Sequence, residues 1–163
     1  MGDKDNTQRV WDIIDKVGVC MLTTRSGNGL RARPLEARPD RNAGQIFFVT
    51  DIRSAKEHEI EAAPDVGLVF IDSSDKAYLS ITGRAYVTRD PAKLKAVWRK
   101  TDEVWWPGGA DDPNVCLLRI EPVRAELWDG PASAAVEAFE FVKAKVTGKE
   151  PKLGQNRKVT TEM

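Results

Sequence analysis

Short strand-like segments, most of them joined by turns of hairpin length, constrain this sequence more than any other feature. Apolar and β-branched residues gather in about seven such runs, and helical spacing occurs only in single segments beside them. A doubly wound parallel sheet would need a helix between nearly every pair of strands. We therefore predict a mainly β protein, a small antiparallel barrel with peripheral helices. The predicted strands are residues 17–24, 30–37, 45–50, 66–71, 77–88, 115–120 and 124–128, and the predicted helices are 7–16, 54–63, 90–100 and 133–146.

Local signals support several of these boundaries. Ser54, followed by Glu three residues later, has the form of a capping box at a helix start. Asp90 followed by Pro91 is typical of another helix start. Gly83, in the middle of a long strand, predicts a bulge. Pro34 cannot donate to a ladder, so the second strand is expected at an edge of the sheet.

Composition narrows the class of protein. The 163 residues suit one domain, predicted over residues 1–148, with a charged tail over 149–163. Lys plus Arg equals Asp plus Glu at 25 each, which argues against nucleic acid or an anionic membrane as the main partner. No apolar run approaches the roughly 18 residues that span a bilayer, and the polar start has no signal-peptide pattern. We expect a cytoplasmic protein.

The sequence has few residues from which a metal site or a nucleophilic triad is built. His58 is the only histidine, and Cys20 and Cys116 are the only cysteines. The two cysteines lie far apart in apolar strand-like runs, which favours buried, reduced thiols. We predict no metal site, and no side chain stands out as a catalytic acid or base.

Three cations are candidates for one anion site. Lys56 lies in the first turn of the helix predicted to begin at Ser54, where free backbone N–H groups and the helix dipole favour an anion. Arg31 and Arg33 share one face of the second strand, because side chains alternate along a strand. Arginine suits bidentate phosphate contact. The alternative is a set of solvated surface cations; adjacent antiparallel strands that bring all three together favour a phosphate site.

Two aromatic residues, Trp105 and Trp106, precede a Pro-Gly-Gly turn. Such a pair suits either a wall for a flat ligand or a plug at the end of the barrel. The residues by themselves favour core packing.

The order of these motifs resembles a known family. Arg-x-Arg-Pro-Leu on one strand, Phe-Phe-Val-Thr-Asp with Ser-x-Lys on the next, and Gly-Arg-Ala at 83–85 are similar to the FMN-binding split-barrel superfamily of the pyridoxamine 5′-phosphate oxidases. Residues 105–113, followed by 117–120 and 126–129, resemble its general-stress-protein branch. The resemblance covers residues 8–148.

The resemblance implies an antiparallel, six- or seven-stranded FMN-binding split barrel that forms a homodimer. Its cofactor is FMN, or FAD as an alternative, in clefts between the subunits. By position, residues 31–34 resemble the strand along the flavin phosphate and ring edge, residues 50–51 the contacts to the ribityl chain and ring, and residues 54–56 the phosphate-binding helix start. The implied cofactor-binding residues are Arg31, Ala32, Arg33, Pro34, Val49, Thr50, Asp51, Ser54, Lys56 and Trp105.

The sequence also departs from the oxidases. Ala55 precedes Lys56 where they carry Arg, and Glu36 stands where they carry Lys, a loss that Arg33 is expected to offset. Their substrate-binding C-terminal strand with Arg and His is replaced by a helix and a charged tail. The favoured function is an FMN-dependent oxidoreductase of a small molecule, linked to stress response. The alternatives are a non-enzymatic flavin-binding stress module and a split barrel that holds a deazaflavin or haem.

These departures predict negligible pyridoxamine 5′-phosphate oxidase activity in flavin-loaded protein. A substrate phosphate beside the flavin phosphate needs a second set of cations, and Arg31, Arg33 and Lys56 serve only one. Formation of pyridoxal 5′-phosphate under aerobic conditions measures this activity. Turnover should stay well below the roughly 1 s⁻¹ usual for enzymes on their own substrates. A rate at that level would contradict our interpretation of the C-terminal segment.

Overall fold

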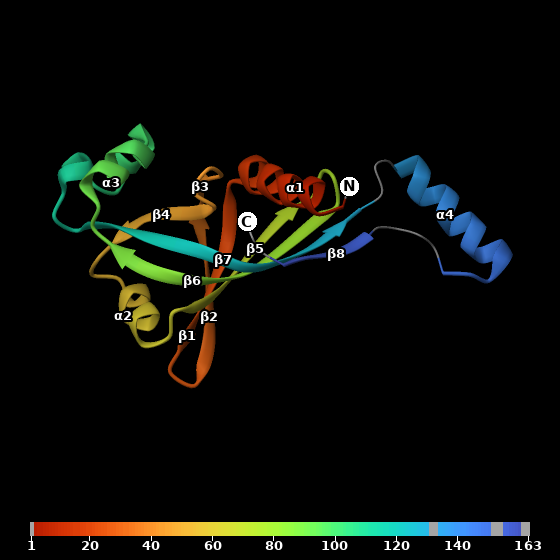
Figure 1. Cartoon of the computed structure of the whole chain (residues 1–163), viewed down its shortest axis with the longest axis horizontal. Helices are drawn as coiled ribbons and strands as arrows, with labels where there is room; N and C mark the ends of the chain where they lie inside the picture. Colours follow the sequence, from red (N-terminus) through yellow and green to blue (C-terminus); the bar gives the residue numbers. More distant parts are fainter. Residues whose placement is uncertain (1, 131–133, 151–154, 161–163) are drawn as a thin grey trace.

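The computed structural model describes residues 2–130, 134–150 and 155–160. Its helices lie around one antiparallel sheet (Figure 1). The strands are β1 (Val19–Ser26), β2 (Gly29–Glu36), β3 (Arg38–Asp40), β4 (Gln45–Asp51), β5 (Asp65–Asp72), β6 (Ala77–Thr88), β7 (Val115–Asp129) and β8 (Gln155–Thr160). The helices are α1 (Gly2–Val17), α2 (Ala55–Ala62), α3 (Pro91–Val97) and α4 (Ala134–Thr147), with 3-10 turns at Lys100–Val104 and Gly109–Asp111.

The strand order is β2–β1–β5–β6–β7–β4–β3, with β8 paired to the free side of β7. The predicted mainly β fold is confirmed. Among the described strands, the two ends of this order, β2 and β3, do not pair with each other, so the barrel is open. The edge position expected for the strand with Pro34 is also confirmed, because β2 pairs only with β1.

Three features of the sheet differ from the sequence prediction. The two strands expected on either side of Glu121 and Pro122 are one strand, β7, because the proline lies at a register shift where the ladder is already irregular. That shift between Thr82 and Gly83 is the predicted bulge. Strand β3 is a short pairing within the expected turn. Strand β8 forms within the expected charged tail, since the open edge of β7 orders a segment without an apolar pattern of its own.

A further difference concerns the two strands expected to form the anion site. The cationic strand β2 and strand β4, which precedes α2, are not neighbours as expected but lie near opposite ends of the strand order. The expectation of adjacent strands is therefore wrong. Curvature of the sheet, with α2 packed against β1 and β6, brings the two segments together instead.

The main core lies between α1 and the concave face of the sheet. Helix α1 buries Val10, Ile13 and Ile14 completely, at helical spacing, and inward side chains from β1, β4, β5, β6 and β7 complete this core. A smaller cluster on the other face of β4 and β7 holds Phe47 and Leu117 under α3 and the loop that follows it.

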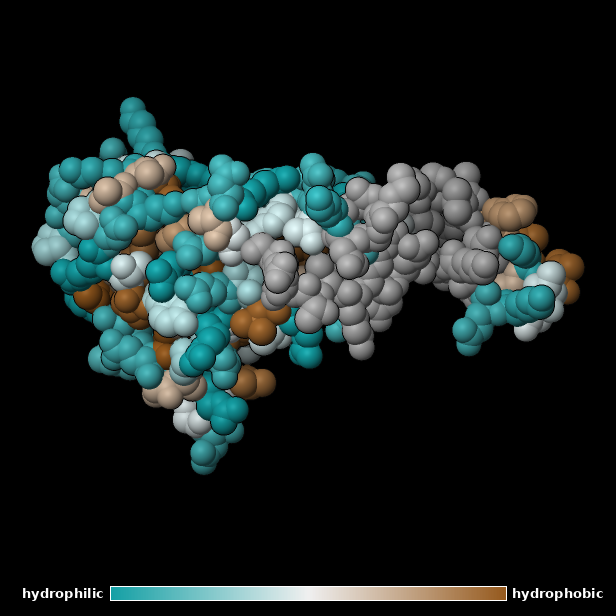
Figure 2. Space-filling view, viewed as in Figure 1, coloured by the Kyte–Doolittle hydropathy of each residue, from teal (hydrophilic) through white to brown (hydrophobic). Residues whose placement is uncertain are grey.

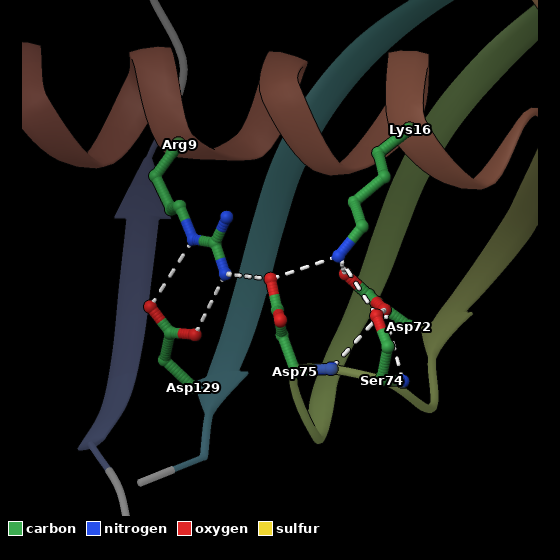
Figure 3. A network of polar contacts seen from close by, with 6 residues as sticks. All are labelled: Arg9, Lys16, Asp72, Ser74, Asp75 and Asp129. Carbon is green, nitrogen blue, oxygen red and sulfur yellow. Dashed lines mark hydrogen bonds and ion pairs between the residues drawn. The ribbon is translucent and has the colours of Figure 1, made fainter. Parts of the chain in front are cut away.

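A polar network fixes α1 on the sheet (Figure 3). Arg9 donates to Asp129 at 3.1 Å, and Lys16 pairs with Asp72 at 2.7 Å. Asp75 lies between these cations, 2.9 Å from Lys16 Nζ and 3.8 Å from Arg9 Nη2. The Lys16 ammonium holds the pKa of Asp72 well below its usual range. Helix α1 is thereby tied to the β5–β6 turn and to the end of β7.

No helix among the described residues is both long enough and apolar enough to cross a bilayer.

A buried ion pair anchors the segment that follows α3. Arg38 donates to both carboxylate oxygens of Asp102, at 2.9 and 3.1 Å, and to the Val97 carbonyl at 2.9 Å. Both charged side chains are under a tenth exposed. Because each charge is the main partner of the other, the pair joins the sheet edge to the loop that carries both tryptophans of the Pro-Gly-Gly motif.

The substitution Asp102→Asn should lower the free energy of unfolding by about 3–5 kcal/mol, because it removes the buried carboxylate that accepts two hydrogen bonds from Arg38 and leaves only the partly exposed Glu36 as a countercharge. Urea unfolding followed by tryptophan fluorescence measures the loss. The matched control is Asp111→Asn: this carboxylate is 80% exposed and 3.6 Å from Lys95, so about 1 kcal/mol or less is expected. Equal losses in the two variants would show that the Arg38–Asp102 pair is no anchor.

Candidate functional site

The first turn of α2 holds a lysine that forms no ion pair with the described carboxylates. Lys56 is half-buried, and no carboxylate of the described residues forms an ion pair with it. Burial lowers the pKa of Lys56, and the neighbouring guanidinium groups of Arg33 and Arg31 lower it further. Lys56 is a cation held partly out of water beside two other cations. An anion bound next to it would stabilise its charged form.

Beside it lies an unsatisfied hydroxyl. Ser54 is the N-cap of α2, as predicted, but its Oγ makes no capping hydrogen bond and is buried without a partner. The predicted capping box is therefore wrong. A capping hydroxyl would accept a hydrogen bond from the Glu57 N–H. This N–H donates at 3.2 Å to the backbone carbonyl of Ser54 instead. Buried polar atoms without partners are rare, so this hydroxyl indicates a place for a ligand atom.

The two arginines of β2 share one face, as predicted, but a protein carboxylate lies between them. Arg33 donates to Glu59 at 2.6 Å and to Thr24 at 2.7 Å, and Arg31 lies 3.7 Å from Glu59. The Thr24 hydroxyl and then the Arg33 guanidinium lower the pKa of Glu59 to about 2. Arg33, 14% exposed, is committed to this pair, whereas Arg31, on the same face, is 59% exposed.

The remaining predicted residues of β2 lie on the opposite face. Ala32 pairs with Thr23 and Pro34 with Met21, so they share the outer face of the sheet with these neighbours. The predicted flavin contacts along this strand therefore divide between two faces. A ligand that touches both must wrap around the edge of β2.

The end of β4 brings its residues toward α2. Thr50 is buried opposite Cys116, whereas Val49 packs into the smaller apolar cluster. Asp51 accepts from Arg53 at 2.6 Å, and this bond holds the pKa of Asp51 well below its usual range. Thr50 and Asp51 thus lie next to the start of α2, as predicted, but Asp51 already has a cationic partner.

The two neighbouring tryptophans lie in different environments. Trp106 packs against Trp98, with ring centroids 6.3 Å apart, and belongs to the smaller cluster. Trp105 is 77% exposed and outside the core. Core packing, favoured by the residues alone, holds for Trp106 only.

Glu36 pairs with two arginines, and neither of them is Arg33. Its carboxylate accepts from Arg38 at 3.0 Å and also from Arg99. Arg33, expected to offset the charge change at this position, is occupied by Glu59. The signal missed in the sequence is Glu59 itself, three residues after Lys56 and therefore on the same side of α2.

A groove lies at the other end of α2. It encloses about 520 Å³, a size typical of small-molecule sites. Its lining is Thr23, Thr24, Arg25, Leu30, Ala62, Ala63, Asp65, Val66, Gly67 and Thr82.

Comparison with known proteins identifies the family of this chain. Residues 5–152 match the family described as pyridoxamine 5′-phosphate oxidase like. The chain belongs to this family. The resemblance seen in the motifs is thus confirmed, and the matched range includes the residues at the start of α2 and those that line the groove.

Relatives in the family carry stress-protein names. General stress protein 26 of Bacillus subtilis is 28% identical over 132 residues, which is 79% of this chain and 92% of that protein. A crystal structure assigned to general stress protein 26 of Jannaschia sp. CCS1 is 28% identical, with a TM-score of 0.80 over 97% of this chain and 99% of that one. A general stress FMN/FAD binding protein from Xanthomonas citri is 26% identical, with a TM-score of 0.72 over 80% of this chain and 92% of that one.

The ion pair between Arg33 and Glu59 predicts a pH-dependent contribution to stability. The pKa of Glu59 lies at about 2 in the folded protein against an ordinary 4.5. The stabilisation is therefore fully present above about pH 4.5 and is lost as the pH falls toward 2. The variant Glu59→Gln should unfold about 1–3 kcal/mol more easily than the parent at pH 7.

Urea unfolding of both proteins between pH 7 and pH 2.5 tests this expectation. The difference in unfolding free energy should stay constant down to pH 5 and shrink below it. A difference that does not change with pH would show that Glu59 acts by packing rather than by charge.

Proposed function

We propose that this protein binds a flavin mononucleotide, with FAD as the alternative, and that the flavin phosphate lies at the start of α2. The observation that carries the proposal is the pairing of Lys56, a half-buried cation without a carboxylate, with the buried and unsatisfied hydroxyl of Ser54. A phosphate accepts hydrogen bonds from both and from the free N–H groups of the first helical turn. The FMN/FAD binding protein from Xanthomonas citri supports the same ligand class.

The residues present fit such a ligand. Lys56 and Ser54 hold the phosphate, and Arg31, the exposed arginine of β2, supplies a second cation. Arg33 acts differently from its predicted role: paired with Glu59, it braces β1 and β2 against α2 and leaves the net charge of that pair near zero. Thr50 and Asp51 border the same site, and Trp105, exposed on its loop, is free to meet a ligand or a second copy.

We propose further that the protein is a homodimer with the flavin between its subunits. The outer face of β1, β5 and β6 exposes several large apolar side chains, and β2 is an open edge. Both features favour a partner that covers them. Ala32 and Pro34 lie on this outer face, so a ligand bound at the edge of β2 meets the partner there.

A bound flavin supplies electron transfer to or from a small molecule. The chain's own contribution is to bind the phosphate, orient the ring edge along β2 and exclude water with the partner subunit. We propose oxidoreduction of a small-molecule substrate under stress. The alternative is a non-enzymatic flavin-binding module. Bleaching of the flavin absorbance by NADH or NADPH, followed by reoxidation in the presence of an acceptor, favours the enzyme, and inert flavin bands favour the module.

The substitution Lys56→Ala tests the phosphate site. Loss of one charge-assisted contact should cost about 1.5–3 kcal/mol, which weakens FMN binding by roughly 10- to 100-fold. Titration of FMN, followed by quenching of its fluorescence, measures the dissociation constant. The affinity should also fall as the pH rises toward the lowered pKa of Lys56, because only the ammonium form attracts the phosphate.

Lys95→Ala is the control, since this lysine is 62% exposed on α3 and lies outside the site. It should bind FMN as the parent does. An unchanged affinity in Lys56→Ala would remove the α2 start from the flavin site.

A further inference from the structure

Helix α4 projects from the barrel (Figure 1). Phe139, Val142 and Val146 are 64%, 64% and 81% exposed. Their spacing of three and four residues places them in one stripe along the helix, whereas Phe141 lies on another side. Figure 2 shows apolar surface at this outer end of the molecule. A helix normally buries such a stripe, but none of the described residues covers this one.

The root of the helix is fixed at one corner of the sheet. Asp129 is held by Arg9 at 3.1 Å and pairs with Gln155 of β8, so the chain leaves and rejoins the sheet at the same place. The next residue, Gly130, lies so close to the β5–β6 turn that a Cβ there would be 2.5 Å from the Lys76 carbonyl oxygen. This contact holds Gly130 against the β5–β6 turn, and α4 stands away from the sheet (Figure 1).

An exposed row of apolar side chains starts at this corner, on the outer face of the sheet. Met21 pairs with Val69, Ile71 with Tyr78, and Tyr78 with Trp128. Paired residues share a face, so these side chains are neighbours. With Val19, they are between 37% and 52% exposed. We call Val19, Met21, Val69, Ile71, Tyr78 and Trp128 the outer row.

We propose that α4 is an exchanged arm, whose stripe packs on the outer row of a second copy of this chain. The inference rests on the homodimer proposed above and adds the element that holds it together. A two-fold axis then pairs each arm with the other subunit's row, which is the self-complementary arrangement of most homodimers.

The area argument favours a second copy as the occupant. With about 150–250 Å² for each large side chain, the outer row exposes roughly 500 Å² and the stripe roughly 350 Å². A stable dimer buries about 800 Å² on each partner. The row alone falls short of this area, but the row and the stripe of one copy together reach it.

The competing occupant is the chain's own sheet. Three residues separate Gly130 from α4, which is at most about 10 Å of extended chain. To lie on its own outer row, the helix would have to reverse direction immediately after the contact between Gly130 and the β5–β6 turn. Packing on a second copy needs no such reversal.

Cross-linking of two single variants tests the exchange. Val142→Cys places a thiol on the stripe and Ile71→Cys one on the outer row, while the native Cys20 and Cys116 are buried and unreactive. The two proteins are mixed, left to exchange subunits and treated with a short bis-maleimide. A covalent dimer is expected from the mixture. Asn42→Cys, in the exposed β3–β4 turn, mixed with Val142→Cys should give none.

Two results would overturn the exchange. One is absence of the covalent dimer from the mixture. The other is an intrachain cross-link in the Val142→Cys, Ile71→Cys double variant at high dilution, which would place α4 on its own sheet. Sedimentation of the untreated parent separates the two proposals: a dimer that does not cross-link contradicts only the exchanged arm, whereas a monomer contradicts the proposed dimer as well.

Substitution on the stripe provides a second measurement. Phe139→Ser combined with Val142→Ser should raise the dimer dissociation constant by roughly 100-fold or more, as loss of central apolar contacts does. Phe141→Ser removes another exposed side chain, 51% exposed, from the same helix but off the stripe, and should leave the constant unchanged. Equal weakening by both variants, or by neither, would contradict the assignment of the stripe.

Discussion

Strands β6 and β7 approach each other so closely at Gly83 that no other residue fits there without a shift of the backbone. A Cβ at this position would lie 2.8 Å from an Ile120 methyl and 2.9 Å from the Glu121 carbonyl oxygen. The register shifts at this point, and the two halves of β7 take different neighbours. The first half pairs with β4 and the second with β8. The turn from β4 into α2 therefore lies at one end of β7 and the root of α4 at the other.

Charge pairing decides what the α2 site is able to bind. Arg33, Arg38 and Arg53 each have a carboxylate at 3.0 Å or less. Lys56 has none among the described residues. Positive and negative residues are equal in number in this chain, so the excess positive charge at Lys56 is a local feature. The anion that we propose at the start of α2 would supply the missing charge and also the missing partner of Ser54 Oγ.

The sequence predicted much of the fold because its signals are local. Alternating apolar residues, the Asp90-Pro91 helix start and the glycine at the bulge each depend on a few neighbouring residues, and Asp90 indeed accepts from the Lys93 N–H at 3.0 Å. The failures involve contacts between distant segments. Nothing local shows that Glu59 neutralises Arg33, or that the Ser54 carbonyl occupies the N–H that a capping hydroxyl would use. Strand β8 was missed for the same reason, since its order comes from the edge of β7.

The sequence by itself determined the fold class and the family, and it supplied the residues of the anion site that we propose. These conclusions rest on signals visible in the linear sequence: the strand and helix periods, the turn residues and the order of the motifs. Only the tertiary structure decided which of those residues are available. It paired Arg33 with Glu59, packed Trp106 against the smaller cluster, exposed Trp105, and gave Lys56 no carboxylate partner among the described residues. The physical reason is that availability depends on burial and on countercharges, and both are set by segments that meet only when the sheet has curved.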